Sequence, residues 1–205
     1  MDWTDILPIA LSVVSILLSG YSIFRTSVLS RYPKQEPLYS DIMILLKQNM
    51  NYNSTIDKIL GIDSYTGSTK KLSPNEITCK VRRYFGRKEC KLLCDILELC
   101  NRANIADSTM YTLFSTIESG DPDKYQEICN AIIAENDDEL TEQEYNKAAA
   151  YLNKIKIYIK EEYDGVKWVK YDYREIEKTI SMLSKQIDEK VKVLKKSLEK
   201  KLMRR

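Results

Sequence analysis

The sequence predicts an all-α fold: one N-terminal transmembrane helix, then a cytosolic multi-helix bundle that ends in a long C-terminal amphipathic helix. Three observations carry this prediction. Residues 6–24 contain no charged side chain. The chain has only six glycines and five prolines, too few for a typical all-β or disordered protein. Helix-start patterns recur along the rest of the chain.

The uncharged run is long enough to cross a bilayer. As a helix, its nineteen residues would extend over roughly 28 Å, close to the thickness of a hydrocarbon core. Asp2 and Asp5 precede the run, whereas Arg25 and Arg31 follow it. This positive-inside bias places the N-terminus outside the cell and the main domain in the cytoplasm, at the inner membrane. We therefore expect a membrane anchor over residues 1–26.

The rest of the chain is expected to form a linker over residues 27–39 and one helical domain over residues 40–205. Pro33 and Pro37 favour an extended linker, because each disfavours helix in the residue before it. Capping patterns at Ser73, Asp107, Asp121 and Thr141 start helices in the domain. The predicted helices cover residues 41–61, 74–86, 88–104, 108–119, 122–135, 142–163 and 171–205. Residues 155–160 alternate as a strand does, but they lie between helical segments and are predicted to be helical.

The last helix has the clearest periodicity. Its apolar residues recur at steps of three and four in an eleven-residue repeat, which keeps them on one face of a nearly straight helix. This seam consists of Ile180, Leu183, Ile187, Val191, Leu194, Leu198 and Leu202. Either the seam packs on the protein's own domain, or it is shared with a second copy of the chain.

Composition excludes several kinds of chemistry. The chain has no histidine, which removes His-based nucleophilic dyads, His general acids and bases, and His-ligated metals. The five cysteines lack the paired spacing of zinc knuckles, and no glycine-rich phosphate loop occurs. We therefore expect no enzyme activity, no catalytic residue, no cofactor and no metal. The net charge of +2 does not indicate a general polyelectrolyte partner.

One face of the predicted anchor carries hydroxyl groups. Ser12, Ser15, Ser19 and Ser22 recur at steps of three and four, which places them on one arc of a helix. We call this set the serine stripe. Transmembrane helices associate through small residues and interhelical hydrogen bonds, so we expect a homo-oligomer that packs through the stripe. The alternatives are a solitary anchor and a ring of helices in which the stripe lines a pore.

A second candidate site is a basic segment that surrounds two aromatic residues, Tyr84 and Phe85. Its candidate phosphate or lipid contacts are Lys80, Arg82, Arg83, Arg87 and Lys88. Three interpretations fit this pattern. The segment is a solvated turn with both rings packed inward, a contact with anionic membrane lipids, or a nucleic-acid site in which bases stack on the rings. The basic C-terminal tail has the same ambiguity between lipid and nucleic acid.

In layout, the chain is similar to small bacterial defence proteins that carry one N-terminal span and a helical cytosolic domain. One type is the membrane pore accessory of RNA-targeting CRISPR systems, which is related to helical ribonuclease domains with an Arg–His motif. Arg82, Arg83 and Arg87 lie where such an arginine could stand, but the chain has no histidine to complete the motif. The resemblance therefore implies a non-catalytic effector or pore in antiviral defence, rather than a ribonuclease.

Together these patterns predict a non-enzymatic, single-pass membrane protein that homo-oligomerises and presents a helical interaction domain at the inner membrane. Membrane lipids, other copies of the chain and a protein ligand of the domain are the expected partners. The alternative is a membrane-tethered module that binds RNA or DNA.

Overall fold

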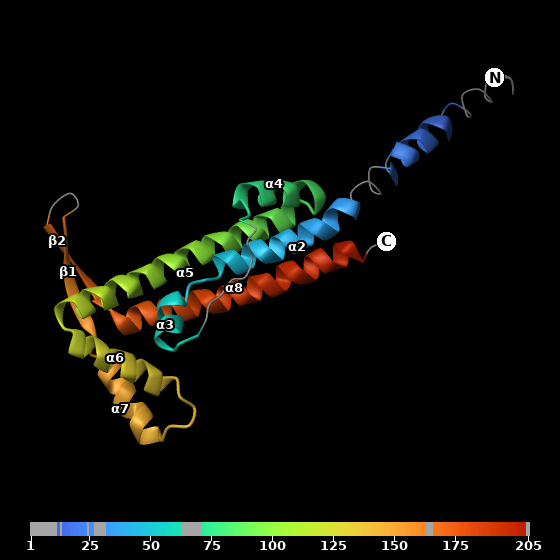
Figure 1. The fold of residues 1–205 in the computed structure, drawn as a ribbon. Helices are drawn as coiled ribbons and strands as arrows, with labels where there is room; N and C mark the ends of the chain where they lie inside the picture. The colour runs from blue at the N-terminus through green and yellow to red at the C-terminus, as the bar shows by residue number, and fades with distance from the viewer. Residues whose placement is uncertain are drawn as a thin grey trace, which may run out of the picture.

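The computed structural model describes residues 12, 14–23, 25–26, 32–62, 71–162 and 166–203. In this part the chain is mostly helical, as predicted, and forms an elongated bundle (Figure 1). Its elements are α2 (Tyr32–Asn49), α3 (Ser54–Ile59), α4 (Pro74–Tyr84), α5 (Arg87–Gly120), α6 (Pro122–Glu135), α7 (Glu142–Leu152), β1 (Lys156–Glu162), β2 (Val166–Asp172) and α8 (Tyr173–Leu202).

Two long helices form the spine of the bundle. α5 and α8 pack side by side along most of their length, and α2 lies against both (Figure 1). α4 folds back along the start of α5. At one end of the spine lie the start of α2, the turn between α4 and α5, and the end of α8. The α6–α7 pair and the β-hairpin lie at the other end (Figure 1).

The apolar seam of α8 is buried in the protein's own core. Five of its members are at most 6% exposed: Ile180, Leu183, Ile187, Leu194 and Leu198. α5 provides much of the opposing surface through buried residues that include Leu93, Ile96 and Met110. The interpretation that the seam packs on its own domain is confirmed. The seam is therefore not available to a second copy of the chain.

The predicted starts of α4, α6 and α7 are confirmed. α4 begins at Pro74, directly after Ser73. The Asp121 side chain accepts a hydrogen bond from the Lys124 amide at 3.0 Å. Thr141 and Glu144 form a capping box, because the side chain of each accepts from the backbone amide of the other. Such bonds satisfy the first amides of a helix, which have no partner within it. (The Ser73 side chain makes no capping bond.)

The predicted helix start at Asp107 is wrong. α5 passes through this position without a break, so the predicted helices 88–104 and 108–119 are one helix. The buried Asp107 carboxylate instead holds the start of α3, accepting from the Ser54 hydroxyl at 2.6 Å and the Thr55 amide at 3.1 Å. Asp107 thus satisfies a helix start that is remote in sequence, which no local pattern reveals.

The prediction of an extended linker up to residue 39 is also wrong, because α2 begins at Tyr32 and contains Pro37. A proline inside a helix costs about 3 kcal/mol, since it removes one backbone hydrogen bond and crowds a carbonyl. The following turns bury Leu38, Ile42 and Leu45. Each such side chain contributes about 1.5–3 kcal/mol on burial, so packing outweighs the local penalty.

A β-hairpin replaces the predicted end of the helix over 142–163. α7 ends at Leu152, and β1 pairs antiparallel with β2 from Lys156 opposite Asp172 onward. The alternation of apolar and polar residues in this segment correctly indicated a strand. The prediction of a helix gave more weight to the helical segments on either side.

A mostly buried arginine connects the start of α8 to α6 and α7. The Arg174 guanidinium pairs with the Glu135 carboxylate and donates to Glu177 Oε2 at 2.7 Å and to Asn153 Oδ1 at 2.9 Å. The Arg174 and Glu135 side chains are only 16% and 11% exposed. These bonds satisfy most of the donors of a group that is costly to bury alone.

Among the described residues, no helix is both long enough and apolar enough to cross a membrane. The predicted span over residues 6–24 lies partly outside the described part of the chain. Its described portion comprises Ser12 and the helical residues 14–23, which we call the N-terminal apolar helix. In Figure 1 this helix lies beyond the start of α2.

Candidate functional site

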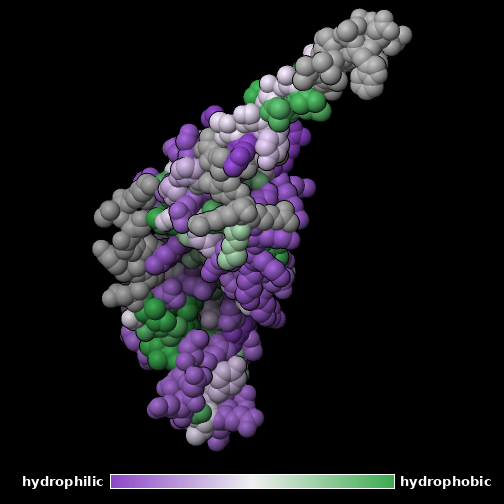
Figure 2. All heavy atoms as spheres, turned by 90° about the vertical axis from the view of Figure 1, so that its right-hand side faces the viewer, coloured by the Kyte–Doolittle hydropathy of each residue, from purple (hydrophilic) through white to green (hydrophobic). Residues whose placement is uncertain are grey.

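The N-terminal apolar helix exposes its side chains on all sides. Its large apolar residues are 50–71% exposed: Val14, Ile16, Leu17, Leu18, Tyr21 and Ile23. Figure 2 shows hydrophobic surface on this helix, in the upper part of the view, and a second hydrophobic patch low on the bundle, with hydrophilic residues over much of the remaining face. Each large apolar side chain left in water lacks the stabilisation of about 1.5–3 kcal/mol that full burial would provide. An uncharged helix whose large apolar side chains lie outside the protein's own core is typical of an apolar environment.

Ser15, Ser19 and Ser22 of the serine stripe lie on residues 14–23 of this helix, and Ser12 lies two positions before residue 14. Ser12, Ser15, Ser19 and Ser22 are all helical and exposed. Beyond the C-terminal end of the stripe, the Thr26 hydroxyl donates to the Ser22 carbonyl at 2.8 Å. A hydroxyl in this segment can therefore bond to its own helix, which is the behaviour expected of a solitary anchor.

The basic segment lies at the corner between α4 and α5. Arg82 and Arg83 are exposed near the end of α4, and Arg87 and Lys88 are exposed at the start of α5. Lys80 differs from these four, because its ammonium pairs with the Glu76 carboxylate one turn earlier in α4. The structure therefore leaves four of the five predicted side chains available at the corner.

The two aromatic rings of the segment are not free to stack on bases. Phe85 is buried in the core, with 4% of its surface exposed. Tyr84 is half-buried, and two cations lie over its ring: the Lys34 ammonium at 5.9 Å and the Arg83 guanidinium at 5.6 Å from the centroid. These contacts bring Lys34, from the start of α2, into the basic corner.

Two remote helices hold the turn between α4 and α5. The Gln35 amide group donates to the Tyr84 carbonyl at 2.7 Å, and the Lys201 ammonium donates to the Phe85 carbonyl. Directly after Phe85, Gly86 adopts a φ of +118°, a backbone conformation that residues with a side chain disfavour. The start of α2, this turn and the end of α8 are therefore one connected unit.

A buried carboxylate lies beneath the basic corner. Glu89 is 2% exposed, and it accepts from the Lys201 ammonium at 2.7 Å and the Ser197 hydroxyl at 2.8 Å. Burial alone would raise the pKa of Glu89, but the hydrogen bonds from Lys201 and Ser197 outweigh it and hold the pKa below its ordinary value. Glu89 is therefore an internal counter-ion of Lys201 and does not neutralise the exposed cations.

The short sequence patterns did not predict that Lys34, Glu89 and Lys201 belong to this corner. A periodic pattern does point to Glu89, which precedes Leu93 and Ile96 at helical spacing and so lies on the buried face of α5. The roles of Lys34 and Lys201 depend on helix packing across the whole length of the chain, for which no short pattern exists.

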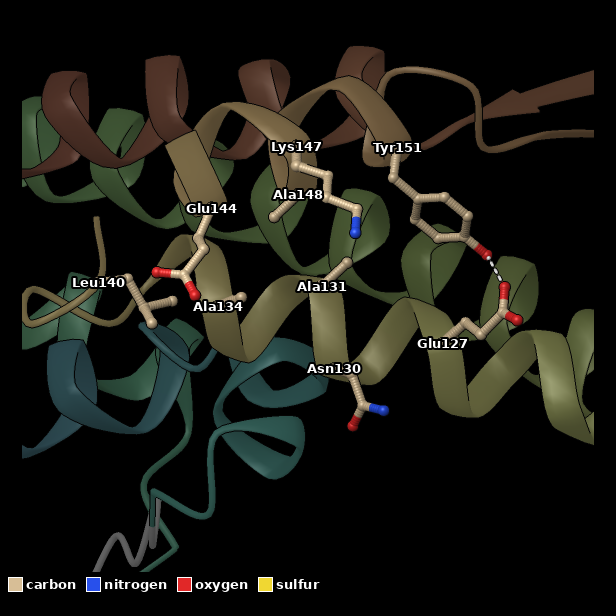
Figure 3. A pocket seen from close by; sticks show the side chains of 9 residues that line it. All are labelled: Glu127, Asn130, Ala131, Ala134, Leu140, Glu144, Lys147, Ala148 and Tyr151. Atoms are coloured by element: carbon tan, nitrogen blue, oxygen red, sulfur yellow. Dashed lines mark hydrogen bonds between the residues drawn. The ribbon is translucent and has the colours of Figure 1, made fainter. Parts of the chain in front are cut away.

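An open groove of about 590 Å³ lies between α6 and α7, at the end opposite the basic corner. Its apolar lining comes from Ala131, Ala134, Leu140 and Ala148, with charged and polar side chains around them (Figure 3). At one end, the Tyr151 hydroxyl donates to Glu127 Oε2 at 2.9 Å. Burial and this bond raise the pKa of Tyr151 to about 12, so the phenol stays protonated at neutral pH and is unsuited to act as a base.

The described residues contain no group of three or more Cys, Asp or Glu side chains that could hold a metal ion. All five cysteines are free thiols. Cys100 is buried in the core, and burial raises its pKa to about 11, which suppresses the reactive thiolate.

Comparison with known proteins gives no relative. No protein-family model matches this chain, and neither a curated protein nor a solved structure matches it. The residues and their geometry therefore carry the functional argument alone.

Proposed function

We propose that this chain is a non-enzymatic, single-pass membrane protein whose copies associate through the serine stripe. In this proposal residues 6–24 cross the inner membrane, and the helical bundle lies on its cytoplasmic side. The observation that carries the proposal is the exposure of the N-terminal apolar helix on all sides. A bilayer would bury these side chains, and the uncharged run has the length that a hydrocarbon core requires.

The serine stripe supports association of the spans. Lipid tails are as apolar as leucine, so helices in a bilayer gain little from hydrophobicity and associate through close packing and hydrogen bonds. Serines on one arc allow both. A homo-oligomer of this kind is suited to perturb or permeabilise a bilayer, as expected of the bacterial defence effectors that the chain is similar to in layout. In the most specific form of the proposal, the stripe lines a pore.

Nucleic-acid binding is the weaker alternative. Single-stranded nucleic acids are held by cations together with exposed rings on which bases stack. Here Phe85 is buried and Tyr84 is covered by two cations, which leaves only phosphate contacts.

Replacement of all four stripe serines by leucine tests the association. The full chain in mild detergent should give a particle of several copies by native mass spectrometry, and the leucine variant should give mostly single chains. Val14→Leu with Leu17→Ile, on the opposite face of the helix, is the matched control and should leave the mass unchanged. A parent protein that is already a single chain, or a leucine variant of unchanged mass, would reject association through the stripe.

Extraction of membranes with alkaline carbonate tests the span separately. An integral membrane protein should stay in the pellet, because its apolar helix remains in the bilayer. Release of the full chain into the supernatant would reject the span itself.

A further inference from the structure

We propose that the basic corner is a docking surface for the headgroups of anionic phospholipids. We call the surface the basic collar, and it consists of Lys34, Arg82, Arg83, Arg87, Lys88 and Lys200. This inference rests on the proposed membrane anchor and adds a second contact with the same bilayer.

The collar residues come from four helices, α2, α4, α5 and α8, which meet at this end of the bundle. Lys34 and Arg83 share the ring of Tyr84. Lys201, the neighbour of Lys200, bonds to the turn that connects Arg83 to Arg87. Figure 1 shows the start of α2, this turn and the end of α8 at the same end of the bundle. The collar is thus a fixed feature of the fold rather than a set of cations on flexible chain.

Two of the acids near the collar are paired with lysines that are not part of it. Glu89 is buried and paired with Lys201, and Glu76 pairs with Lys80. Glu199 accepts a hydrogen bond from the Tyr39 hydroxyl at 3.0 Å. Glu36 is exposed, and Glu199 keeps its negative charge because the Tyr39 donor is neutral, so these two acids lower the net charge by two. The collar is therefore strongly positive, and its charge is complementary to an anionic surface.

The position of the collar in the chain argues for lipid as the ligand. Residues 25–31 connect the end of the uncharged run to α2, and even a fully extended segment of this length spans no more than roughly 30 Å. The collar surrounds the start of α2, so it is the part of the bundle that the anchor would hold nearest to the headgroups. Cations attract anionic lipids only within about a Debye length of the surface, roughly 8–10 Å, and the short tether favours that approach.

Lipid retention by the full chain in detergent tests this inference. The purified protein is titrated with phosphatidylglycerol or with phosphatidylcholine, and bound lipids are counted by native mass spectrometry. The parent protein should prefer phosphatidylglycerol. The variant with Arg82, Arg83, Arg87 and Lys88 all changed to Gln should lose at least tenfold in apparent affinity, because each cation near an anionic surface is worth about fivefold before screening. These side chains are exposed, so the melting temperature should stay that of the parent.

The matched control removes the same number of charges at the far end of the bundle. It changes Lys124, Lys147, Lys154 and Lys178 to Gln, all of which are exposed. The control should retain the preference for phosphatidylglycerol. Equal binding of both lipids by the parent protein, or an equal loss in the control, overturns the inference.

Two further outcomes separate this inference from its alternatives. A salt-sensitive gel shift with single-stranded RNA, lost in the collar variant and unaccompanied by a lipid preference, would overturn the inference and assign the collar to nucleic acid. The collar variant should remain in the carbonate pellet, because the span is unchanged. A negative result in the lipid-binding assay would thus reject the collar proposal without affecting the proposed anchor. Release of the protein by carbonate would reject the anchor, whatever the collar binds.

Discussion

Removal of the Lys201 ammonium is expected to destabilise the end of the bundle that carries the collar. In Lys201→Ala, Glu89 stays buried but loses its cationic partner, and the Phe85 carbonyl loses a donor. Breaking a buried ion pair costs about 3–5 kcal/mol. The Lys201 side chain is 36% exposed, so water can partly replace it, and Ser197 still donates to Glu89. We therefore expect the free energy of unfolding to fall by about 2 kcal/mol at neutral pH.

The loss in free energy of unfolding caused by Lys201→Ala should depend on pH. In the parent protein the folded-state pKa of Glu89 is lowered, so its contribution to stability is present above the ordinary pKa of 4.5 and is lost as the pH falls through the lowered value. In the variant, burial is opposed by fewer hydrogen bonds, and the Glu89 pKa should rise instead. Acidification then protonates the unpaired Glu89 carboxylate, which reduces the destabilisation of the variant. The difference between the two proteins should be largest near neutral pH and shrink toward pH 4.

Urea unfolding of the full chain in detergent, followed by far-ultraviolet circular dichroism at neutral and acidic pH, measures both quantities. Lys196→Ala, an exposed position on the same helix, is the control and should change the free energy of unfolding by less than about 0.5 kcal/mol. A Lys201→Ala protein as stable as the parent at neutral pH would refute the assignment of a buried pair. A penalty that is the same at both pH values would refute the electrostatic explanation.

Two further stability predictions concern the turn between α4 and α5 and the far end of the bundle, and the same unfolding assay measures both. Gly86→Ala should lower the free energy of unfolding by about 1–3 kcal/mol, because its φ of +118° disfavours any side chain. Gly120→Ala, which adds a Cβ in open space at the end of α5, should be neutral or slightly stabilising, and an equal loss at both glycines would contradict the backbone argument. Arg174→Met should cost about 3 kcal/mol, because it leaves the mostly buried Glu135 carboxylate unpaired. The exposed Lys178→Met is its control, and similar losses in both variants would show that the pairing contributes little.

The sequence predicted those parts of the fold that depend on local patterns. The helix starts at Pro74, Pro122 and Glu142 were predicted from residues within four positions and are confirmed, although only Asp121 and Thr141 make the capping bond and Ser73 does not. The buried seam of α8 follows from periodicity alone. The choice between its own domain and a second copy, however, required the opposing helix α5, whose course the sequence does not reveal.

The errors occurred where contacts remote in sequence override a local preference. Pro37 predicted an extended linker, yet the buried residues that follow it keep α2 helical. Asp107 has the character of a cap but serves α3 through space. The alternation over residues 155–160 was outweighed by its helical neighbours, although the nearby Asp164-Gly165 pair is itself typical of a hairpin turn.

The candidate site was predictable only in part. Charge patterning identified Arg82, Arg83, Arg87 and Lys88, because four exposed cations adjoin one break between helices. It did not reveal that Lys80 is paired, or that Lys34 joins the group over the ring of Tyr84. These facts depend on which side chains meet after folding.

The unbroken course of α5 has a mechanical consequence. Its 34 residues span about 50 Å, and α8 reinforces it along most of that length. Helices locked by a shared core shift as a rigid body, because closely packed interiors yield little to strain. A force applied to the α6–α7 pair would therefore rotate the bundle as one rigid body and displace its opposite end, without rearrangement of the side chains between the two ends.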